Sequence, residues 1–236
     1  MIESPAMSFV FAPPALVSVP VAGGGAFPVH RIYCVGRNYA EHAVEMGFSG
    51  REPPFFFLKP ADTVLAVAQG ETGAMDYPTL TQNLHHEVEL VVAIGTGGQH
   101  ISADQAAQHI WGYAVGLDMT RRDLQGEMKK QGRPWCIGKA FEQSAPIGPL
   151  LPKASTGELT RGAITLSVNG VMKQQGDLKD LIWNVNETIA AISAAWTLMP
   201  GDLIYTGTPA GVGAVVRGDV MEASIHGLPA LRVALR

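Results

Sequence analysis

The chain has 236 residues, of which 47% are hydrophobic and 16% are charged, and its formal net charge is −4. These values exclude a disordered chain, and the length suits one large domain with a substantial core. The mild acidity, without any stripe of lysine and arginine, argues against nucleic acid as a partner because nothing would neutralise a phosphate backbone.

The two cysteines, Cys34 and Cys136, lie far apart without CxxC spacing. They therefore predict neither a zinc site nor a disulfide framework, and they fit a reducing compartment. No segment approaches the roughly 20 uninterrupted apolar residues of a membrane helix, and the N-terminal stretch has no basic leader. We therefore expect a cytoplasmic protein without a membrane partner.

The N-terminal stretch, residues 1–30, is apolar but broken by prolines and a triple glycine. This pattern predicts an extended arm ahead of one domain that spans residues 31–236. A strand is expected at 31–35. Asn38 then stands as a candidate N-cap for a helix in the segment GRNYAEHAVEM.

Two side chains on that helix suggest acid–base chemistry. His42 and Glu45 are three residues apart, which places them on one helix face. A histidine whose ring is oriented by a carboxylate is the arrangement of a general base, although the same spacing also occurs in ordinary surface pairs. The loop that follows, GFSGREPP (47–54), is marked by glycine and proline and is of the kind that acts as a mobile lid.

The next two predicted strands are apolar and carry charges near their ends. PPFFFLKP (53–60) predicts a short strand, and Lys59 in it is either solvated or paired in the interior. LHHEVELVVAIG (84–95) predicts a buried strand, yet Glu87 and Glu89 stand directly before its apolar run.

Alternation along the strand decides which of these side chains meet. Glu87 and Glu89 point to one face, a few ångströms apart, where two like charges repel. A positive partner is therefore expected between them. The same alternation places His85, and not His86, on their face, and we expect a supporting or structural role for both histidines in preference to direct ligation of a metal.

A third acid, Asp118, ends the apolar strand expected at 111–120. Three carboxylates brought together at strand ends form an all-oxygen site, which suits a hard cation such as Mg²⁺, Mn²⁺ or Ca²⁺ and not zinc. The alternative interpretation is that Glu87 and Glu89 are solvated on an exposed face, as most charged residues are.

The second half of the chain alternates short helices and strands. Helical composition is found at 103–110 and 120–131, a hairpin is expected at 164–168 with the turn Asn169-Gly170, and an amphipathic helix at 185–198. The irregular spacing argues against a doubly wound sheet. It predicts a mixed β, α+β fold with short peripheral helices.

Two further segments could contribute to a site. Lys139, in IGKAF, stands beside apolar residues and is either solvated or partly buried near the acids. The glycine-rich TGTPAGVG (206–213) offers backbone N–H groups and hydroxyls for a carboxylate, but it lacks the P-loop pattern. A plain turn is the alternative.

Seven segments together resemble the fumarylacetoacetate hydrolase family, in order and in spacing, over residues 31–236. They are GRNYAEHAVEM, FFFLKP, LHHEVELVVAIG, GYAVGLDMTRRDLQ, GRPWCIGKAF, VNG and GDLIYTGTPAGVG. The chain is most similar to the compact, single-domain members that cleave acylpyruvates, among them the bacterial fumarylpyruvate hydrolases of gentisate degradation. The resemblance implies the family's β-sandwich roll, a catalytic domain at 31–236, and a homodimer.

The resemblance also assigns roles to individual positions. It implies that Mg²⁺ or Mn²⁺ is held by Glu87, Glu89 and Asp118, and that water is activated by the helix residues His42 and Glu45. It also implies that Lys139 contacts the substrate and that the pocket is lined by Arg122, Gln125 and Thr208. Lys59 or Arg122 is expected to meet a second carboxylate of the substrate. Larger members have an extra N-terminal domain and a fourth acid ligand, and neither is found here.

The implied activity is hydrolysis of a carbon–carbon bond in a small anionic keto acid. Fumarylpyruvate, cleaved to fumarate and pyruvate, is the expected substrate. The first alternative uses the same metal site for decarboxylation or keto–enol tautomerisation of oxaloacetate. The second is a catalytically silent scaffold that binds a metal or ligand.

Overall fold

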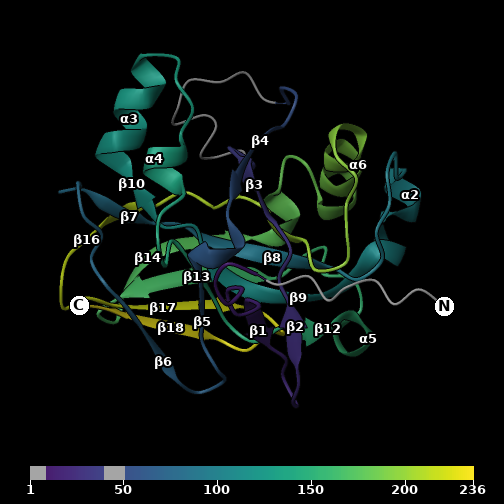
Figure 1. The fold of residues 1–236 in the computed structure, drawn as a ribbon, viewed down its shortest axis with the longest axis horizontal. Helices are drawn as coiled ribbons and strands as arrows, with labels where there is room; N and C mark the ends of the chain where they lie inside the picture. Colours follow the sequence, from purple (N-terminus) through teal and green to yellow (C-terminus); the bar gives the residue numbers. More distant parts are fainter. Residues whose placement is uncertain (1–8, 40–50) are drawn as a thin grey trace.

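Two large β-sheets form most of the structure, a computed structural model that describes residues 9–39 and 51–236 (Figure 1). The larger sheet has eight strands. In spatial order they are β4 (Phe55–Lys59), β3 (Ile32–Gly36), β15 (Leu203–Tyr205), β8 (Val88–Ile94), β9 (Ile110–Leu117), β11 (Ala145–Ile147) and β5 (Val64–Ala66), with β12 (Leu151–Pro152) paired to β9. This sheet is curled, so that β3 and β4 rise away from β8 and β9 in Figure 1.

The second large sheet has five strands and lies against β8 and β9 (Figure 1). Its order is β14 (Val171–Asp177), β13 (Ala163–Val168), β17 (Val220–Ile225), β18 (Leu231–Leu235) and β6 (Thr72–Met75). Two small sheets complete the set: β10 (Thr120–Arg121), β7 (Leu84–His86) and β16 (Gly213–Val215) form one, and β1 (Ser18–Pro20) and β2 (Ala26–Pro28) form the other.

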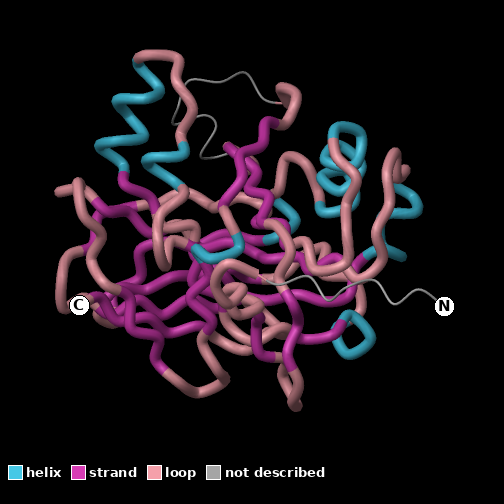
Figure 2. Tube along the Cα trace, in the orientation of Figure 1, coloured by secondary structure: helices cyan, strands magenta, loops and turns pink. Residues whose placement is uncertain are grey.

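The helices are short and lie at the periphery of the sheets (Figure 2). They are α2 (Ala103–Ala106), α3 (Arg122–Lys130), α4 (Cys136–Lys139), α5 (Lys153–Thr156) and α6 (Val185–Ala195), with 3₁₀ turns η1 (Ala61–Thr63), η2 (Ala107–His109) and η3 (Leu178–Asp180). The predicted mixed β, α+β class with peripheral helices is confirmed. Within the described residues, no helix is long and apolar enough to cross a membrane.

Strand β8 is buried on both faces, which explains its unbroken apolar sequence. Leu90 and Val92 belong to the core between the two large sheets, whereas Val91 and Ala93 belong to a second core on the other side of β8. Because strand side chains alternate, Glu89 shares its face with Val91 and Ala93. It therefore points away from the five-stranded sheet.

The predicted hairpin at 164–168 is confirmed as β13 and β14. Asn169 and Gly170 form its two-residue turn, and both have positive φ, at 51° and 77°. This backbone is that of a type I′ turn, for which Asn-Gly is the favoured pair. Strand β14 of this hairpin carries Gln174 toward the acidic residues.

Helix α6 begins as the sequence predicts and ends earlier than expected. Asn184 and Glu187 form a capping box at its N-terminus. At the other end, Trp196 has extended backbone and its ring lies 5.6 Å from that of Tyr33 and 6.1 Å from that of Phe56. Packing of the indole against these rings takes the chain out of the helix three residues before the predicted end at 198.

The predicted N-terminal arm contains a hairpin in its described part. Strands β1 and β2 pair, and Val19 and Phe27 on them are buried, with the Phe27 ring 5.1 Å from that of Trp111. This segment therefore contributes to the second core of the larger sheet.

Candidate functional site

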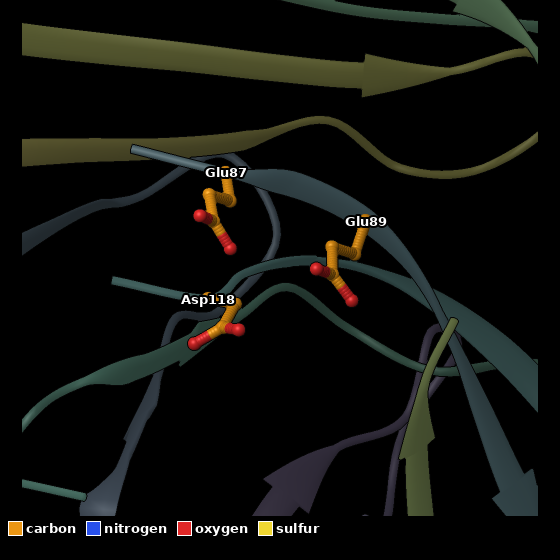
Figure 3. A group of neighbouring side chains, drawn as sticks. All are labelled: Glu87, Glu89 and Asp118. Atoms are coloured by element: carbon orange, nitrogen blue, oxygen red, sulfur yellow. The ribbon is translucent and has the colours of Figure 1, made fainter. Parts of the chain in front are cut away.

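Three buried carboxylates meet at one end of β8 and β9. Oxygens of Glu87, Glu89 and Asp118 all lie within 4.8 Å of one another, and these residues are only 6%, 2% and 1% exposed. Figure 3 shows the three side chains pointing into one space. Within residues 9–39 and 51–236, they form the one group of three or more potential ligands that could hold a metal ion. The predicted meeting of the three acids is confirmed.

Strand pairing explains how the third acid reaches the other two. Val88 of β8 pairs with Leu117 of β9, so that Asp118 follows directly beside Glu87. The backbone N–H of Asp118 donates to the carbonyl oxygen of Glu87 at 2.9 Å. Residues 31 positions apart in the chain are thereby fixed against each other by backbone alone.

Glu89 forms no ion pair with a cation of the described residues. Its carboxylate accepts one hydrogen bond, from the backbone N–H of Gly207 at 2.8 Å. Burial, and then the charges of Asp118 and Glu87, raise its pKa well above the ordinary value. A buried carboxylate in these surroundings needs a cation beside it.

Asp118 also has an oxygen that could serve as a metal ligand. Its Oδ1 is buried and accepts no hydrogen bond from the described residues, although the Lys59 ammonium lies 2.9 Å away. Glu89 without an ion pair, in an all-oxygen cluster with Glu87 and Asp118, fits a hard divalent cation such as Mg²⁺ or Mn²⁺.

Lys139 closes the cluster on one side. Its ammonium donates to Glu87 Oε2 at 2.7 Å, to Asp118 Oδ2 at 2.6 Å and to Thr120 Oγ1 at 2.7 Å. Burial lowers the pKa of Lys139, but the charges of Asp118 and Glu87 outweigh burial and leave the pKa raised. Lys139 is therefore a cation that holds two of the three acids.

Arg122 holds Glu87 from the other side. Its guanidinium forms an ion pair with Glu87 Oε1 and donates to Gln125 Oε1 at 2.6 Å. Although burial disfavours the charge, Lys139 and Arg122 together hold the pKa of Glu87 well below the ordinary value. Glu87 is thus ionised and satisfied, in contrast to Glu89.

The two histidines face opposite directions, as the alternation predicts. His85 lies on the cavity wall, where burial and the charge of Arg122 lower its pKa to about 4. Its neutral ring accepts from Arg122 Nε at 3.3 Å through Nδ1, so the proton is on Nε2, which donates to Asn83. His86 points away from the cavity, and its Nδ1 bonds with Gln174 at 2.9 Å.

Lys59 lies beneath the cluster and does not line the cavity. Its side chain has no exposed surface, and its ammonium donates to the carbonyl oxygens of Met119, Lys139 and Ser144. With its donors engaged in this way, Lys59 positions Asp118 and the backbone of Lys139. This placement leaves it no route to a bound substrate.

Gln174 is a supporting residue that the sequence did not indicate. Its Oε1 accepts from the backbone N–H of Val88, and its Nε2 donates to Thr208 Oγ1 at 2.8 Å and to the carbonyl of Pro209 at 2.9 Å. The Thr208 hydroxyl in turn donates to the carbonyl of Val88 at 2.8 Å. Gln174 thus links Val88, the residue between Glu87 and Glu89, to the glycine-rich loop.

The acids open into a cavity of about 390 Å³, a size typical of small-molecule sites. Arg122, Gln125, Lys139 and Thr208 line it, as the sequence predicts of pocket residues. Sequence reasoning missed the other lining residues, which include Val35, Arg37, Phe57, Lys129, Trp135 and Val212. A larger cavity of about 990 Å³, beside α6, does not contain the three acids.

The predicted dyad falls outside the described residues. His42 and Glu45 lie within 40–50, as does the first half of the predicted lid loop. Asn38, directly before this segment, is buried, and its side chain bonds with the backbone of Trp183 and Thr206. This residue attaches the start of the segment to the strand that leads into the glycine-rich loop.

The chain is similar in sequence and in structure to known proteins. The profile of a family described as "Fumarylacetoacetate (FAA) hydrolase C-terminal" matches residues 31–236. A fumarylpyruvate hydrolase of Ralstonia sp is 49% identical over 177 residues, which is 75% of this chain and 90% of that protein. An oxaloacetate tautomerase of Escherichia coli (strain K12) is 40% identical over 202 residues, covering 85% of this chain and 90% of the relative.

A solved structure supports the same comparison. The crystal structure of fumarylpyruvate hydrolase from Pseudomonas aeruginosa, in complex with Mn²⁺ and pyruvate, superposes with a TM-score of 0.95 at 56% identity. The match covers 97% of this chain and 99% of that one. That relative binds a divalent metal and a small keto acid, the two kinds of ligand that the acids and cations of this cavity suit.

Proposed function

Because this chain belongs to the fumarylacetoacetate hydrolase family, we propose that it hydrolyses a carbon–carbon bond of an acylpyruvate, namely fumarylpyruvate, to give fumarate and pyruvate. The observation that carries the proposal is the buried group of Glu87, Glu89 and Asp118 at the end of a cavity of small-molecule size. The likeness of the whole chain to fumarylpyruvate hydrolases supports the choice of fumarylpyruvate as the substrate.

Glu87, Glu89 and Asp118 would hold Mg²⁺ or Mn²⁺. When bound, the cation supplies Lewis-acid polarisation of the α-keto acid and stabilises the enolate charge that develops as the carbon–carbon bond breaks. Lys139 keeps Glu87 and Asp118 in position and adds a fixed positive charge to the cavity wall. Arg122 orients the Glu87 carboxylate through an ion pair, and it orients the Gln125 side-chain amide through a hydrogen bond.

His42 and Glu45 are proposed to activate the attacking water, on the strength of their place in the GRNYAEHAVEM motif. The water oxygen bonds to the distal carbonyl carbon of the acylpyruvate while its proton passes to His42. The bond between the pyruvate methylene and that carbon then breaks, and its electron pair remains with the pyruvate half as an enolate. This enolate takes the proton from His42 to become pyruvate, and the acyl half leaves as fumarate after its new carboxylic acid group loses its proton to solvent.

Oxaloacetate tautomerisation or decarboxylation is the second candidate function. Relatives named oxaloacetate tautomerase or decarboxylase are 39–42% identical over most of this chain. The same acids and the same Lewis-acid chemistry would serve either reaction, with the dyad reduced to proton transfer. A silent binding scaffold is the third candidate, and it would bind metal without turning over any acylpyruvate.

The family resemblance also supports three properties that go with the proposed activity: a homodimer, a cytoplasmic location and a place in gentisate degradation. Light scattering of the purified protein tests the first of these. A monomeric mass would exclude the homodimer.

The deciding experiment is an absorbance assay of the purified, Mg²⁺-supplemented protein. Fumarylpyruvate, shorter acylpyruvates and oxaloacetate are compared at matched enzyme concentration. We expect loss of the diketone absorbance and a higher kcat/KM for fumarylpyruvate than for oxaloacetate. Equal or reversed preference would assign the protein to the oxaloacetate-active branch of the family, and metal binding without any turnover would favour the scaffold.

A further inference from the structure

The proposed substrate carries a carboxylate at each end, and the acid cluster accounts for one end only. The sequence suggested Lys59 or Arg122 for the distal carboxylate. Lys59 is buried beneath Asp118, and Arg122 is paired with Glu87 at the cluster itself. Apart from Lys139, which pairs with two of the acids, the other described cations on the cavity lining are Arg37, whose guanidinium lies 5.4 Å from the centre of the Phe55 ring, and Lys129 on helix α3.

Helix α3 presents one face along the cavity. Arg122, Gln125, Gly126 and Lys129 all line it, and their spacing of three, four and seven residues places them on one side of a helix. At a rise of 1.5 Å per residue, Lys129 lies about 10 Å along the helix axis from Arg122. Arg122 marks the cluster end, so Lys129 marks the distal end.

The rotation of α3 about its axis is fixed by contacts with neighbouring segments. Asp123 accepts from Thr81 Oγ1 at 2.6 Å and from the backbone N–H of Gln82 at 2.9 Å. Gly138 of α4 packs so closely that an added Cβ would lie 2.8 Å from Gln125. The face that carries Lys129 is therefore held toward the cavity by packing.

The space between the two ends suits a flat, apolar chain. The Phe57 ring lies 5.0 Å from the Lys139 ammonium and 6.1 Å from the Trp135 ring, so an aromatic wall runs outward from the cluster. On the α3 side, a Cβ added to Gly126 would meet no heavy atom within 4 Å. The cavity therefore has open room where a planar, conjugated acyl group would lie.

The charges along the cavity favour an anion at its outer end. Its acidic lining residues are the three acids of the cluster, and no ion pair joins Lys129 to a carboxylate of the described residues. Lys129 is exposed and faces this space with its charge uncompensated by them. A lysine so placed binds a carboxylate as a point charge, with a preference for the dianionic over the shorter monoanionic substrate.

We propose that Lys129 is the residue that selects acylpyruvates with a distal carboxylate. It pairs with that carboxylate at a position about 10 Å along α3 from Arg122, which lies beside the metal ligands. The inference rests on the proposed function and names the feature of the substrate that the cavity recognises. Lys129 acts on binding, so its removal raises KM and leaves kcat near the parent value.

The test compares Lys129→Met with Lys130→Met. Lys130 is the next residue on α3, is also exposed, and does not line the cavity. Each variant is assayed with fumarylpyruvate and with 2,4-dioxopentanoate, which ends in a methyl group. We expect Lys129→Met to raise KM for fumarylpyruvate roughly twofold to fivefold more than KM for 2,4-dioxopentanoate, the usual effect of one charged contact near solvent. Lys130→Met should alter both values equally or not at all.

Fumarate provides a second readout that needs no turnover. Calorimetric titration of the Mg²⁺-loaded parent with fumarate should show binding that weakens severalfold in Lys129→Met but not in Lys130→Met. Equal KM effects on the two substrates, equal effects of the two variants, or fumarate binding that is absent or indifferent to Lys129 would each overturn the inference. Failure of the proposed function is distinct from these outcomes, because the parent would then hydrolyse neither acylpyruvate.

Discussion

Glu89→Gln should stabilise the metal-free protein, although it removes a buried charged group from the centre of the site. The glutamine keeps an oxygen for the Gly207 N–H and has nearly the same shape. What it removes is a desolvated carboxylate whose oxygens lie within 4.8 Å of those of Asp118 and Glu87. No described cation is ion-paired with it, so at neutral pH the metal-free fold must hold an unpaired charge or take up a proton, and either is a cost.

The structure sets the size of the effect. One like-charge pair at this distance costs about 3 kcal/mol at an effective dielectric constant near 20, and attraction to Lys139 offsets part of the two pairs that Glu89 forms. Removing the charge should raise the free energy of unfolding by about 2 kcal/mol. For a chain of this length that corresponds to a rise in Tm of about 4–8 °C.

Glu87→Gln is the matched control, since it makes the same chemical change two residues away. Glu87 is paired with both Lys139 and Arg122, so its neutralisation removes the ion-pair partner of Arg122 and one of the two carboxylates that compensate the buried Lys139. Loss of one partner of a buried pair costs about 3–5 kcal/mol, and Tm should fall. The two substitutions therefore have opposite expected signs.

Thermal unfolding followed by circular dichroism, in chelator and in saturating Mg²⁺, measures both variants. Mg²⁺ should raise the Tm of the parent and have little effect on Glu89→Gln, because a ligand is missing. If Glu89→Gln destabilises the chelated protein as much as Glu87→Gln does, the carboxylate is already compensated and the argument from its missing counter-charge is wrong.

Three further outcomes are expected. Chelation should abolish hydrolysis and Mg²⁺ or Mn²⁺ should restore it, and a full rate after exhaustive chelation would contradict the role of the three acids. His42→Ala should keep the Mg²⁺-induced rise in Tm and fumarate binding but lose about 10² to 10⁴ in kcat, with a smaller loss for Glu45→Gln; a near-parental rate would exclude water activation by the dyad. Gln174→Leu should lower the free energy of unfolding by about 2–4 kcal/mol and weaken Mg²⁺ binding, since it leaves buried groups of Val88 and Thr208 unpaired; Mg²⁺ affinity equal to that of the parent would limit Gln174 to a structural role.

The parts of the site that the sequence predicted depend on local periodicity. Alternation along one strand places Glu87, Glu89 and His85 on the same side, and an acid at the end of another apolar strand is a recognisable signal at Asp118. The Asn169-Gly170 turn likewise follows from its own two residues. These features need no knowledge of how distant segments pack.

The parts that the sequence did not predict are set by packing between distant segments. Lys59 was expected in the pocket, but periodicity does not reveal that the carbonyl oxygens of Met119 and Ser144 surround its ammonium. Gln174 binds groups 86 and 34 residues away, and no pattern in β14 marks it. Lys129 becomes a cavity residue only through the docking of α3, which is a tertiary property.

The charges around the acids couple the binding of the metal to the binding of the substrate. With Glu89 ionised, as metal binding requires, the carboxylates of Glu87, Glu89 and Asp118 carry three negative charges and the cations of Lys59, Lys139 and Arg122 carry three positive charges, so this group sums to zero. Uptake of a divalent ion changes the sum to two positive charges, which is the complement of a dianionic substrate. Metal and substrate should therefore bind with positive cooperativity, and by thermodynamic reciprocity the substrate must tighten the hold on the metal by the same factor. A cell poor in the metal would retain more of the loaded enzyme whenever the substrate accumulates.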